Sequence, residues 1–253
     1  MSANFITGTG TDIGKTWLAC ALLRHWRTEG RQAAAFKPLL SGFDPLQPQA
    51  SDAGALLAAL GRAATTAELD AIAPWRFAAP LAPDMAAALE GRCVDFAELV
   101  AFTRRCLPPV STHPGFRFAA GEGNPRHAER AGASALRPSG NSSICLVEGV
   151  GGVMAPIDAR HTVRDWIAAS GLPCVLVTGS YLGSLSHALT ALEALARVGA
   201  GVTAIAVNET PGSTVALDAT LEALSRHAAG IPLVSVARDT PQAGVARLAA
   251  LLA

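Results

Sequence analysis

The chain has 253 residues, of which half are hydrophobic and 16% are charged, with 20 basic and 20 acidic side chains. This composition supplies enough apolar surface for a large core and excludes global disorder. The balanced charge gives no electrostatic reason to expect nucleic acid or an anionic membrane as a partner. We find no signal peptide and no apolar run of about eighteen residues, so we expect a cytoplasmic protein.

The beginning of the chain predicts a strand, a phosphate-binding loop and a helix. A short strand over Asn4–Thr7 leads into Gly8-Thr-Gly-Thr-Asp-Ile-Gly14-Lys15-Thr16, and an apolar helical pattern follows. Glycines allow backbone N–H groups to surround phosphate oxygens, and a helix start adds partial positive charge. Lys15 would reach the β- and γ-phosphates, and the Thr16 hydroxyl would ligate Mg²⁺. The glycines enclose one residue more than the generic motif, but the pattern still predicts nucleoside triphosphate binding.

Strand-like and helix-like segments alternate along the rest of the chain. The alternation predicts a P-loop-type α/β fold, a parallel β-sheet with helices on both faces in three α/β/α layers. Strands are predicted at 32–36, 143–147, 174–178, 202–207 and 232–236, and helices at 53–60, 82–89, 95–106, 162–170, 184–198, 214–228 and 242–252. Residues 110–141 break the pattern, and we interpret them as a mobile insertion or a functional lid in one domain spanning 1–253.

Charged and polar side chains follow several predicted strands, at the edge where open parallel sheets bind ligands. Lys37 follows the second strand, where it would neutralise phosphate or a developing oxyanion, although a solvated surface charge explains it equally well. Ser41, in the same loop, would hydrogen-bond a small polar substrate. Asp52 is either a first-turn carboxylate that stabilises a helix or a metal ligand. Glu148 follows a buried strand and precedes Gly149-Val-Gly-Gly152, which favours a carboxylate near Mg²⁺.

Two later segments fit either a structural or a binding role. The helix predicted at 184–198 begins after Gly183, and its free N–H groups would bind an anion. His187 on that helix is more simply a structural hydrogen-bonding residue. Asn208 follows the strand TAIAV, where its amide would read a purine or simply end the strand.

Several motifs, taken in chain order, resemble those of the dethiobiotin synthetases, the ATP-dependent enzymes of biotin synthesis. The loop Gly8–Thr16 is similar to G-T-x-T-x-x-G-K-T, and Lys37–Gly42 is similar to K-P-x-x-S-G. Ser51-Asp52 resembles an S-D helix start, and Val147–Gly152 resembles V-E-G-A-G-G. The stretch Leu182–Thr190 is similar to a family motif that begins L-G-x-x-N-H, and Val207-Asn208 resembles the position of the family's adenine-contacting asparagine after a late strand.

The chain departs from this family at several motif positions. This chain has Asp12 where many members have glutamate, Val150 in place of alanine, Tyr181 in place of lysine, and Ser186 in place of asparagine. The segment at 110–141 is absent from most members, and the part after Asn208 matches poorly.

The resemblance implies a reaction and a set of site residues. One amine of 7,8-diaminononanoate (diaminopelargonate) takes up CO₂, the carbamate attacks the ATP γ-phosphate, and the second amine closes the ureido ring of dethiobiotin. The implied roles are catalysis by Lys37, Lys15 and Thr11; substrate binding by Ser41, Gly151, Gly183 and Ser184; ATP binding by Gly10, Thr11, Asp12, Ile13, Gly14, Lys15, Thr16, Asp52, Glu148 and Asn208; and Mg²⁺ binding by Thr16, Asp52 and Glu148. A homodimer is also implied.

The main alternative is a nucleotide-switch ATPase of the partition or metallochaperone type that acts on a protein partner. Such proteins typically carry a further lysine early in the loop, where Gly8-Thr-Gly10 stands here. An amidoligase of the cobyrinate type would need a glutaminase domain, for which this chain has no room. A relative that binds ATP without turnover is a third reading, against which Lys15, Lys37 and Glu148 argue.

Overall fold

The structure is a computed structural model that describes residues 2–107, 144–228 and 230–253, so the predicted insertion at 110–141 lies outside the described residues. Within these ranges, a parallel six-stranded sheet has the order β2-β5-β1-β6-β7-β8. Its strands are β1 (Ser2–Gly8), β2 (Ala33–Phe36), β5 (Ile144–Glu148), β6 (Cys174–Gly179), β7 (Val202–Asn208) and β8 (Leu233–Val236). A smaller parallel pair joins β3 (Leu39–Ser41) to β4 (Trp75–Phe77).

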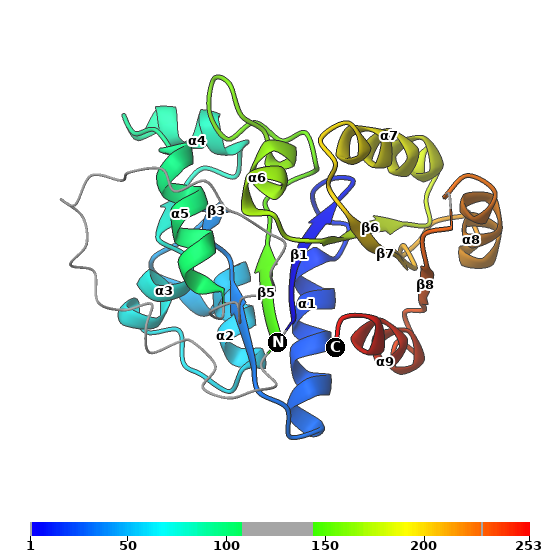
Figure 1. Cartoon of the computed structure of the whole chain (residues 1–253). Helices are drawn as coiled ribbons and strands as arrows, with labels where there is room; N and C mark the ends of the chain where they lie inside the picture. The colour runs from blue at the N-terminus through cyan, green and yellow to red at the C-terminus, as the bar shows by residue number, and fades with distance from the viewer. Residues whose placement is uncertain (1, 108–143, 229) are drawn as a thin grey trace, which may run out of the picture.

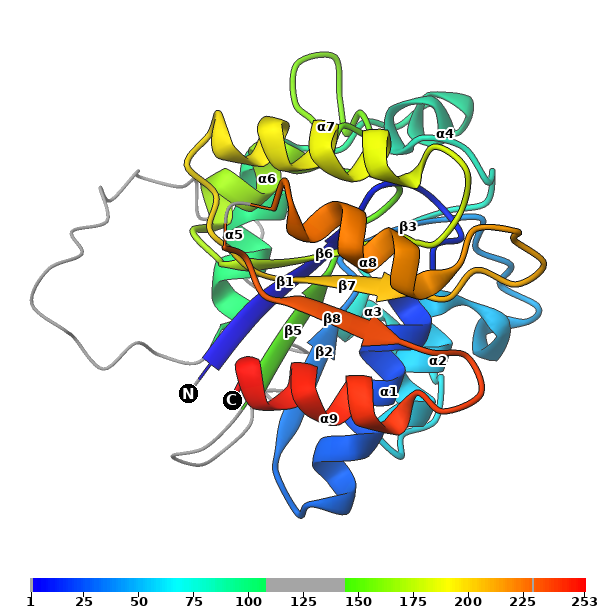
Figure 2. The same cartoon turned by 90° about the vertical axis from the view of Figure 1, so that its right-hand side faces the viewer.

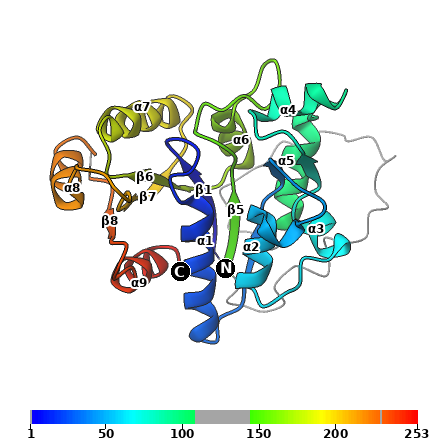
Figure 3. The same cartoon turned by 180° about the vertical axis from the view of Figure 1, so that it is seen from behind.

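Helices cover both faces of the six-stranded sheet (Figure 1). They are α1 (Lys15–Thr28), α2 (Asp52–Ala59), α3 (Thr66–Ile72), α4 (Pro83–Leu89), α5 (Phe96–Cys106), α6 (Val163–Ser170), α7 (Ser184–Ala196), α8 (Leu217–Ser225) and α9 (Gln242–Leu251), with a 3₁₀ turn at Pro48–Ala50. Figure 2 shows α6, α7 and α8 on one face and α1 and α9 on the other. Seen from behind in Figure 3, α3, α4 and α5 lie together on one side of the molecule, and α8 and α9 lie on the other. The predicted three-layer α/β/α fold is confirmed.

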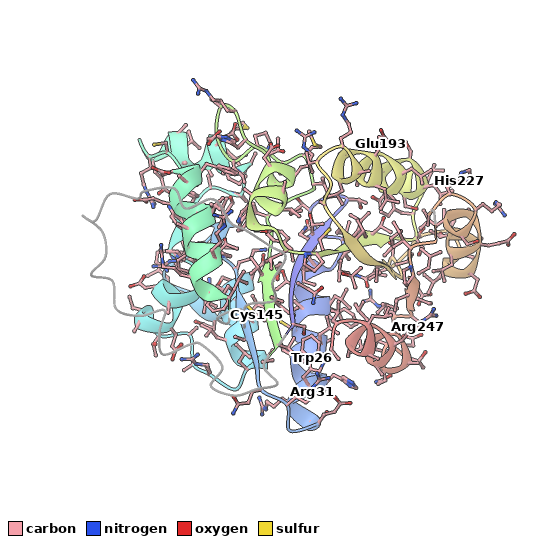
Figure 4. All side chains as sticks on the ribbon, in the orientation of Figure 1. Trp26, Arg31, Cys145, Glu193, His227 and Arg247 are labelled. Carbon is pink, nitrogen blue, oxygen red and sulfur yellow. The ribbon has the colours of Figure 1, made fainter. Side chains whose placement is uncertain are left out.

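The alternation of side chains along the strands divides the core into two layers. Phe5 packs edge to face on Trp166 of α6, with ring centroids 4.8 Å apart. The next residue, Ile6, faces the other layer, which contains Trp26 of α1. Figure 4 shows Trp26 and Cys145 inside this framework, and the exposed side chains of Glu193, His227 and Arg247 at the periphery. Among the described residues, no helix combines the length and apolar character needed to cross a membrane.

Three short elements were missed by the sequence analysis. Strands β3 and β4 have three residues each, which is too short to show an alternating pattern. Helix α3 did carry a signal, because Thr65 and Glu68 form the T-x-x-E spacing of a helix start. In the structure the Thr65 hydroxyl accepts the Glu68 N–H. Strand β3 matters for the site, because it places Ser41 at the end of an ordered strand.

Replacing threonine with valine should change the free energy of unfolding in opposite directions at two buried positions, Thr7 and Thr103. Thr7 Oγ1 on β1 has no hydrogen-bond partner in the described part of the chain, whereas Thr103 Oγ1 donates to Leu99 O and accepts from Trp166 Nε1. Thr7→Val removes an unpaired hydroxyl, so we expect the free energy of unfolding to stay constant or rise by about 1 kcal/mol. Thr103→Val leaves the indole N–H unpaired and should lower that free energy by about 1–3 kcal/mol. Urea unfolding of both variants tests the pair, and equal losses would contradict it.

Candidate active site

The loop between β1 and α1 is held in place by the end of β7. Gly14 has a φ of 87°, and a Cβ on it would lie 2.6 Å from Asn208 Nδ2. Only glycine fits both constraints without strain. Asn208 Nδ2 also donates to Ile13 O at 2.8 Å. On the other side of the loop, Lys15 Nζ donates to Gly10 O at 2.6 Å, so the ammonium is folded back onto the loop that it follows.

The strand order brings further charged groups to this loop. Strand β5 lies between β2 and β1, so the carboxyl ends of three neighbouring strands meet beside the loop. Lys37 directly follows β2, and Glu148 is the last residue of β5. Asp52 is the first residue of α2, whose start is capped by the Ser51 side chain accepting the Gly54 N–H. These side chains come from three separate parts of the sequence and meet at one edge of the sheet.

The Lys37 ammonium is the centre of a buried ionic cluster. Its Nζ lies 2.6 Å from Glu148 Oε1 and 2.9 Å from Asp52 Oδ2, and it donates to Gly149 O at 2.9 Å. Thr16 Oγ1 donates to the same Glu148 Oε1 at 2.6 Å. The side chains of Lys37 and Glu148 are 2% and 1% exposed, and that of Asp52 is 42% exposed. The interpretation of Lys37 as a solvated surface charge is therefore wrong.

Burial and neighbouring charges shift the pKa values of these groups in different directions. Burial, and then the charge of Lys37, lowers the pKa of Lys15 to about 8. Burial would also lower the pKa of Lys37, but the charges of Glu148 and Asp52 outweigh it and raise that pKa above its ordinary value. Burial would raise the pKa of Asp52, but Lys37 lowers it below its ordinary value. Lys37 is therefore a permanent cation, whereas Lys15 loses its proton closer to neutral pH.

A cleft of about 1290 Å³ lies over this cluster. The predicted site residues that line it are Gly10, Thr11, Asp12, Gly14, Lys15, Thr16, Lys37, Ser41, Asp52 and Gly151. The predicted residues outside its lining are Ile13, Glu148, Gly183, Ser184 and Asn208. Glu148 is covered by its contact with Lys37, and Asn208 lies behind the loop that it holds. The structure thus joins the phosphate loop, Lys37 and Asp52 in one cleft and places the start of α7 outside its lining.

The cleft also has walls that the sequence analysis did not predict. They include Trp17 on α1, the segment 80–83, and Met154 in the loop after β5. His187, expected to be structural, has its Nδ1 2.9 Å from Tyr181 Oη and also lies in the lining of the cleft. The motif around His187 contained that signal, whereas nothing in the sequence marked 80–83.

Three oxygen-bearing side chains fit a bound Mg²⁺, namely those of Thr16, Asp52 and Glu148. Hydroxyl and carboxylate oxygens are the ligand types that Mg²⁺ accepts in proteins. Glu148 Oε2 is buried and has no hydrogen-bond partner in the described part of the chain, an arrangement that a cation would relieve.

The loop from β1 to α1, with a carboxylate at the end of the neighbouring strand, defines a P-loop nucleoside triphosphate-binding protein. A family profile described as an AAA domain matches residues 3–238. The ATP-dependent dethiobiotin synthetase BioD of Acidiphilium cryptum (strain JF-5) is 43% identical over 242 residues, which cover 95% of each chain. That of Phenylobacterium zucineum (strain HLK1) is 40% identical over 254 residues, covering 100% of this chain and 96% of the relative. The chain belongs to the dethiobiotin synthetase family.

A comparison with solved structures supports the fold alone. Chloroplast FtsY from Physcomitrella patens superposes with a TM-score of 0.50 and 14% sequence identity, covering 99% of this chain and 65% of that one. The family relatives favour a biosynthetic enzyme over the nucleotide-switch ATPase.

The shifted pKa of Lys15 predicts a pH dependence of nucleotide binding. The chain contains two lysines, Lys15 and Lys37, and its other eighteen basic residues are arginines. Protein carrying ¹³C-labelled lysine therefore has two Cε signals, and without nucleotide or metal we expect the Lys15 signal to titrate near pH 8. Since phosphate oxygens bind the protonated form, ATP affinity should fall as the pH rises through this value. The Lys15→Met variant assigns the signals, and a midpoint at the ordinary 10.5 would contradict the prediction.

Proposed function

We propose that this protein is an ATP-dependent dethiobiotin synthetase that requires Mg²⁺ and converts 7,8-diaminononanoate and CO₂ into dethiobiotin. One observation carries the proposal: a single cleft is lined by both lysines, Lys15 and Lys37, and by Thr16 and Asp52. Glu148 lies beneath this lining, in contact with Lys37 and Thr16. Membership of the dethiobiotin synthetase family supplies the substrate class. The protein would work as a cytoplasmic homodimer without a nucleic-acid or membrane partner.

The proposed reaction has three steps, in which bonds form and break in a defined order. One amine nitrogen adds to CO₂ and loses a proton, which gives a carbamate. A carbamate oxygen then attacks the γ-phosphorus, ADP leaves, and a carbamic-phosphoric anhydride remains. Finally the second amine attacks the carbonyl carbon and loses a proton, the C–O bond to phosphate breaks, inorganic phosphate leaves, and the ureido ring closes.

The roles proposed for the side chains follow from where charge accumulates. Lys15 and Lys37 would neutralise the phosphoryl and carbamate oxygens, where fixed positive charge lowers the barrier most. Thr11 and Ser41 would position the carbamate and the amines, which makes a reaction of several components nearly unimolecular. Thr16, Asp52 and Glu148 would hold Mg²⁺, which neutralises phosphate charge when bound.

The start of α7 and the loop after β5 are proposed to bind the diamine. Gly183, the N-cap residue of α7, has a φ of 95° and, as a glycine, no side chain with which to cap the helix. Ser184 Oγ next to it is buried without a partner in the described part of the chain. The Ser184 N–H donates to Tyr181 O at 2.9 Å, so the later N–H groups of the first helical turn and the unused Ser184 hydroxyl would accommodate the carboxylate of the substrate. In a homodimer this helix would contribute to the partner's cleft, while Gly151 lines its own.

The orientation of Asn208 favours adenine as the base. Since its Nδ2 donates to Ile13 O, the remaining polar atom of the amide is Oδ1, a buried acceptor without a partner in the described part of the chain. Adenine presents an amino group, whereas guanine presents a carbonyl oxygen at the same ring position. We expect Asn208→Ala to raise the KM for ATP by about tenfold, the equivalent of one hydrogen bond, with less change for GTP. Equal rises for both nucleotides would show that Asn208 only supports the loop.

The test of the function is phosphate release from Mg²⁺-ATP with diaminononanoate and bicarbonate, omitting each component in turn. Release that needs both substrates, with dethiobiotin identified by mass spectrometry, is the expected result. Release that ignores the diamine would overturn the proposal in favour of the nucleotide-switch ATPase.

A further inference from the structure

Both carboxylates assigned to Mg²⁺ are already occupied by a cation in this structure. The Lys37 ammonium contacts Glu148 Oε1 at 2.6 Å and Asp52 Oδ2 at 2.9 Å, and Gly149 O accepts at 2.9 Å. An ammonium has three N–H groups, so these three acceptors use all of its donors. In this position Lys37 has no N–H left for a phosphate or carbamate in the cleft.

A directly bound Mg²⁺ would compete with this arrangement. Mg²⁺ demands oxygen ligands at about 2.0–2.1 Å in near-ideal octahedral geometry, so it cannot share two carboxylate oxygens with an ammonium in the space between them. Two cations at such a short separation also repel strongly in a buried environment. Because Glu148 is 1% exposed, it needs a partner whenever it is charged. Either cation would neutralise Glu148, and Mg²⁺ that binds the Oε1 atom requires the ammonium to leave it.

We propose that the Lys37 ammonium is a stand-in for Mg²⁺ in the ligand-free protein, and that metal bound with nucleotide displaces it toward the cleft. The exchange keeps Glu148 neutralised throughout and frees the N–H groups of Lys37 for the reacting oxygens. It rests on the proposed function for the metal and for the role of Lys37. Lysine suits this exchange, because a compact charge on a flexible stem changes partners more easily than the planar fork of arginine.

The first experiment measures metal affinity without nucleotide, using Mn²⁺ as the probe and the signal of free Mn²⁺ as the readout. Lys37→Met removes the competing ammonium, and we expect at least tenfold tighter Mn²⁺ binding than in the unmodified protein. The matched control is Lys15→Met, which removes a nearby buried charge that bonds to Gly10 O instead of a carboxylate. We expect Lys15→Met to bind Mn²⁺ less than threefold more tightly than the unmodified protein. Binding by Lys37→Met no tighter than by the control would overturn the proposal.

The second experiment uses the unmodified protein, so it tests the proposal even if the Lys37→Met variant does not fold. With ¹⁵N-labelled lysine, the two side-chain ammonium groups give separate signals. On adding ADP with Mg²⁺ we expect the Lys37 signal to shift or disappear as its three hydrogen bonds break, whereas ADP with a chelator leaves it in place. The Lys15 signal should respond in both cases, which verifies that ADP is bound.

A Lys37 signal unchanged by ADP with Mg²⁺ would overturn the proposal. Neither readout requires turnover, so a failure of dethiobiotin formation is distinguishable from a failure of the exchange.

Discussion

Replacing Lys37 with methionine is expected to lower the rate of dethiobiotin formation by about 10²–10³-fold, the usual effect of removing one group that stabilises a developing charge. Methionine keeps the packing of the aliphatic stem but carries no charge. ATP should still bind, because the phosphate loop and Lys15 do not depend on this side chain for their hydrogen bonds. The measurement is kcat for product formation beside calorimetric ATP binding.

A second variant and two contrary outcomes make this prediction more specific. Lys37→Arg should not restore the rate, since the arginine fork cannot take the place of a three-donor ammonium between Glu148, Asp52 and Gly149. Turnover of Lys37→Met within tenfold of the unmodified enzyme would remove Lys37 from the mechanism. Loss of ATP binding together with turnover would instead assign it to the nucleotide site.

Replacing Glu148 with alanine is expected to have the largest effect on stability. Within the described part of the chain it would leave the Lys37 ammonium, 2% exposed, with the half-buried Asp52 as its one charged partner, and it would remove the acceptor of Thr16. Breaking a buried ion pair by deleting one partner costs about 3–5 kcal/mol. In a chain of this size that corresponds to a fall in Tm of about 6–20 °C. Thermal and urea unfolding without nucleotide or metal measure the loss.

Asp52→Ala is the matched control for this prediction. It removes the other carboxylate of the same lysine, but this one is 42% exposed, so the loss should be about 1 kcal/mol or less. The double variant Lys37→Met/Glu148→Gln removes both charges, and we expect it to recover much of the stability lost by Glu148→Ala. A loss for Glu148→Ala no larger than for Asp52→Ala would contradict the central place of Glu148 in the cluster.

Much of the fold was predictable, because its signals are local in the chain. The unbroken apolar run before Glu148 predicted a strand covered on both faces, and it is β5, an interior strand of the sheet between β2 and β1. The helix expected at 214–228 is shorter in the structure, where α8 spans Leu217–Ser225. The three-residue strands β3 and β4 were not predictable, because they depend on pairing with each other across more than thirty residues.

The phosphate loop, the order of the longer strands and helices along the chain, and the family resemblance could all be predicted from the sequence. Glycine spacing, apolar periodicity and the residue types at strand ends are properties of short segments, so they can be read without knowing what lies beside them. Lys15, Lys37 and Glu148 were identified on that basis.

The contacts of these side chains follow from the tertiary structure and could not be predicted from the sequence. Lys37 and Glu148 are 111 positions apart in sequence, and β5 brings them together by inserting between β2 and β1. That placement turned a lysine of ambiguous exposure into a buried permanent cation. The reason is physical: burial and charge pairing depend on which strands are neighbours, and strand order is not encoded in any one segment.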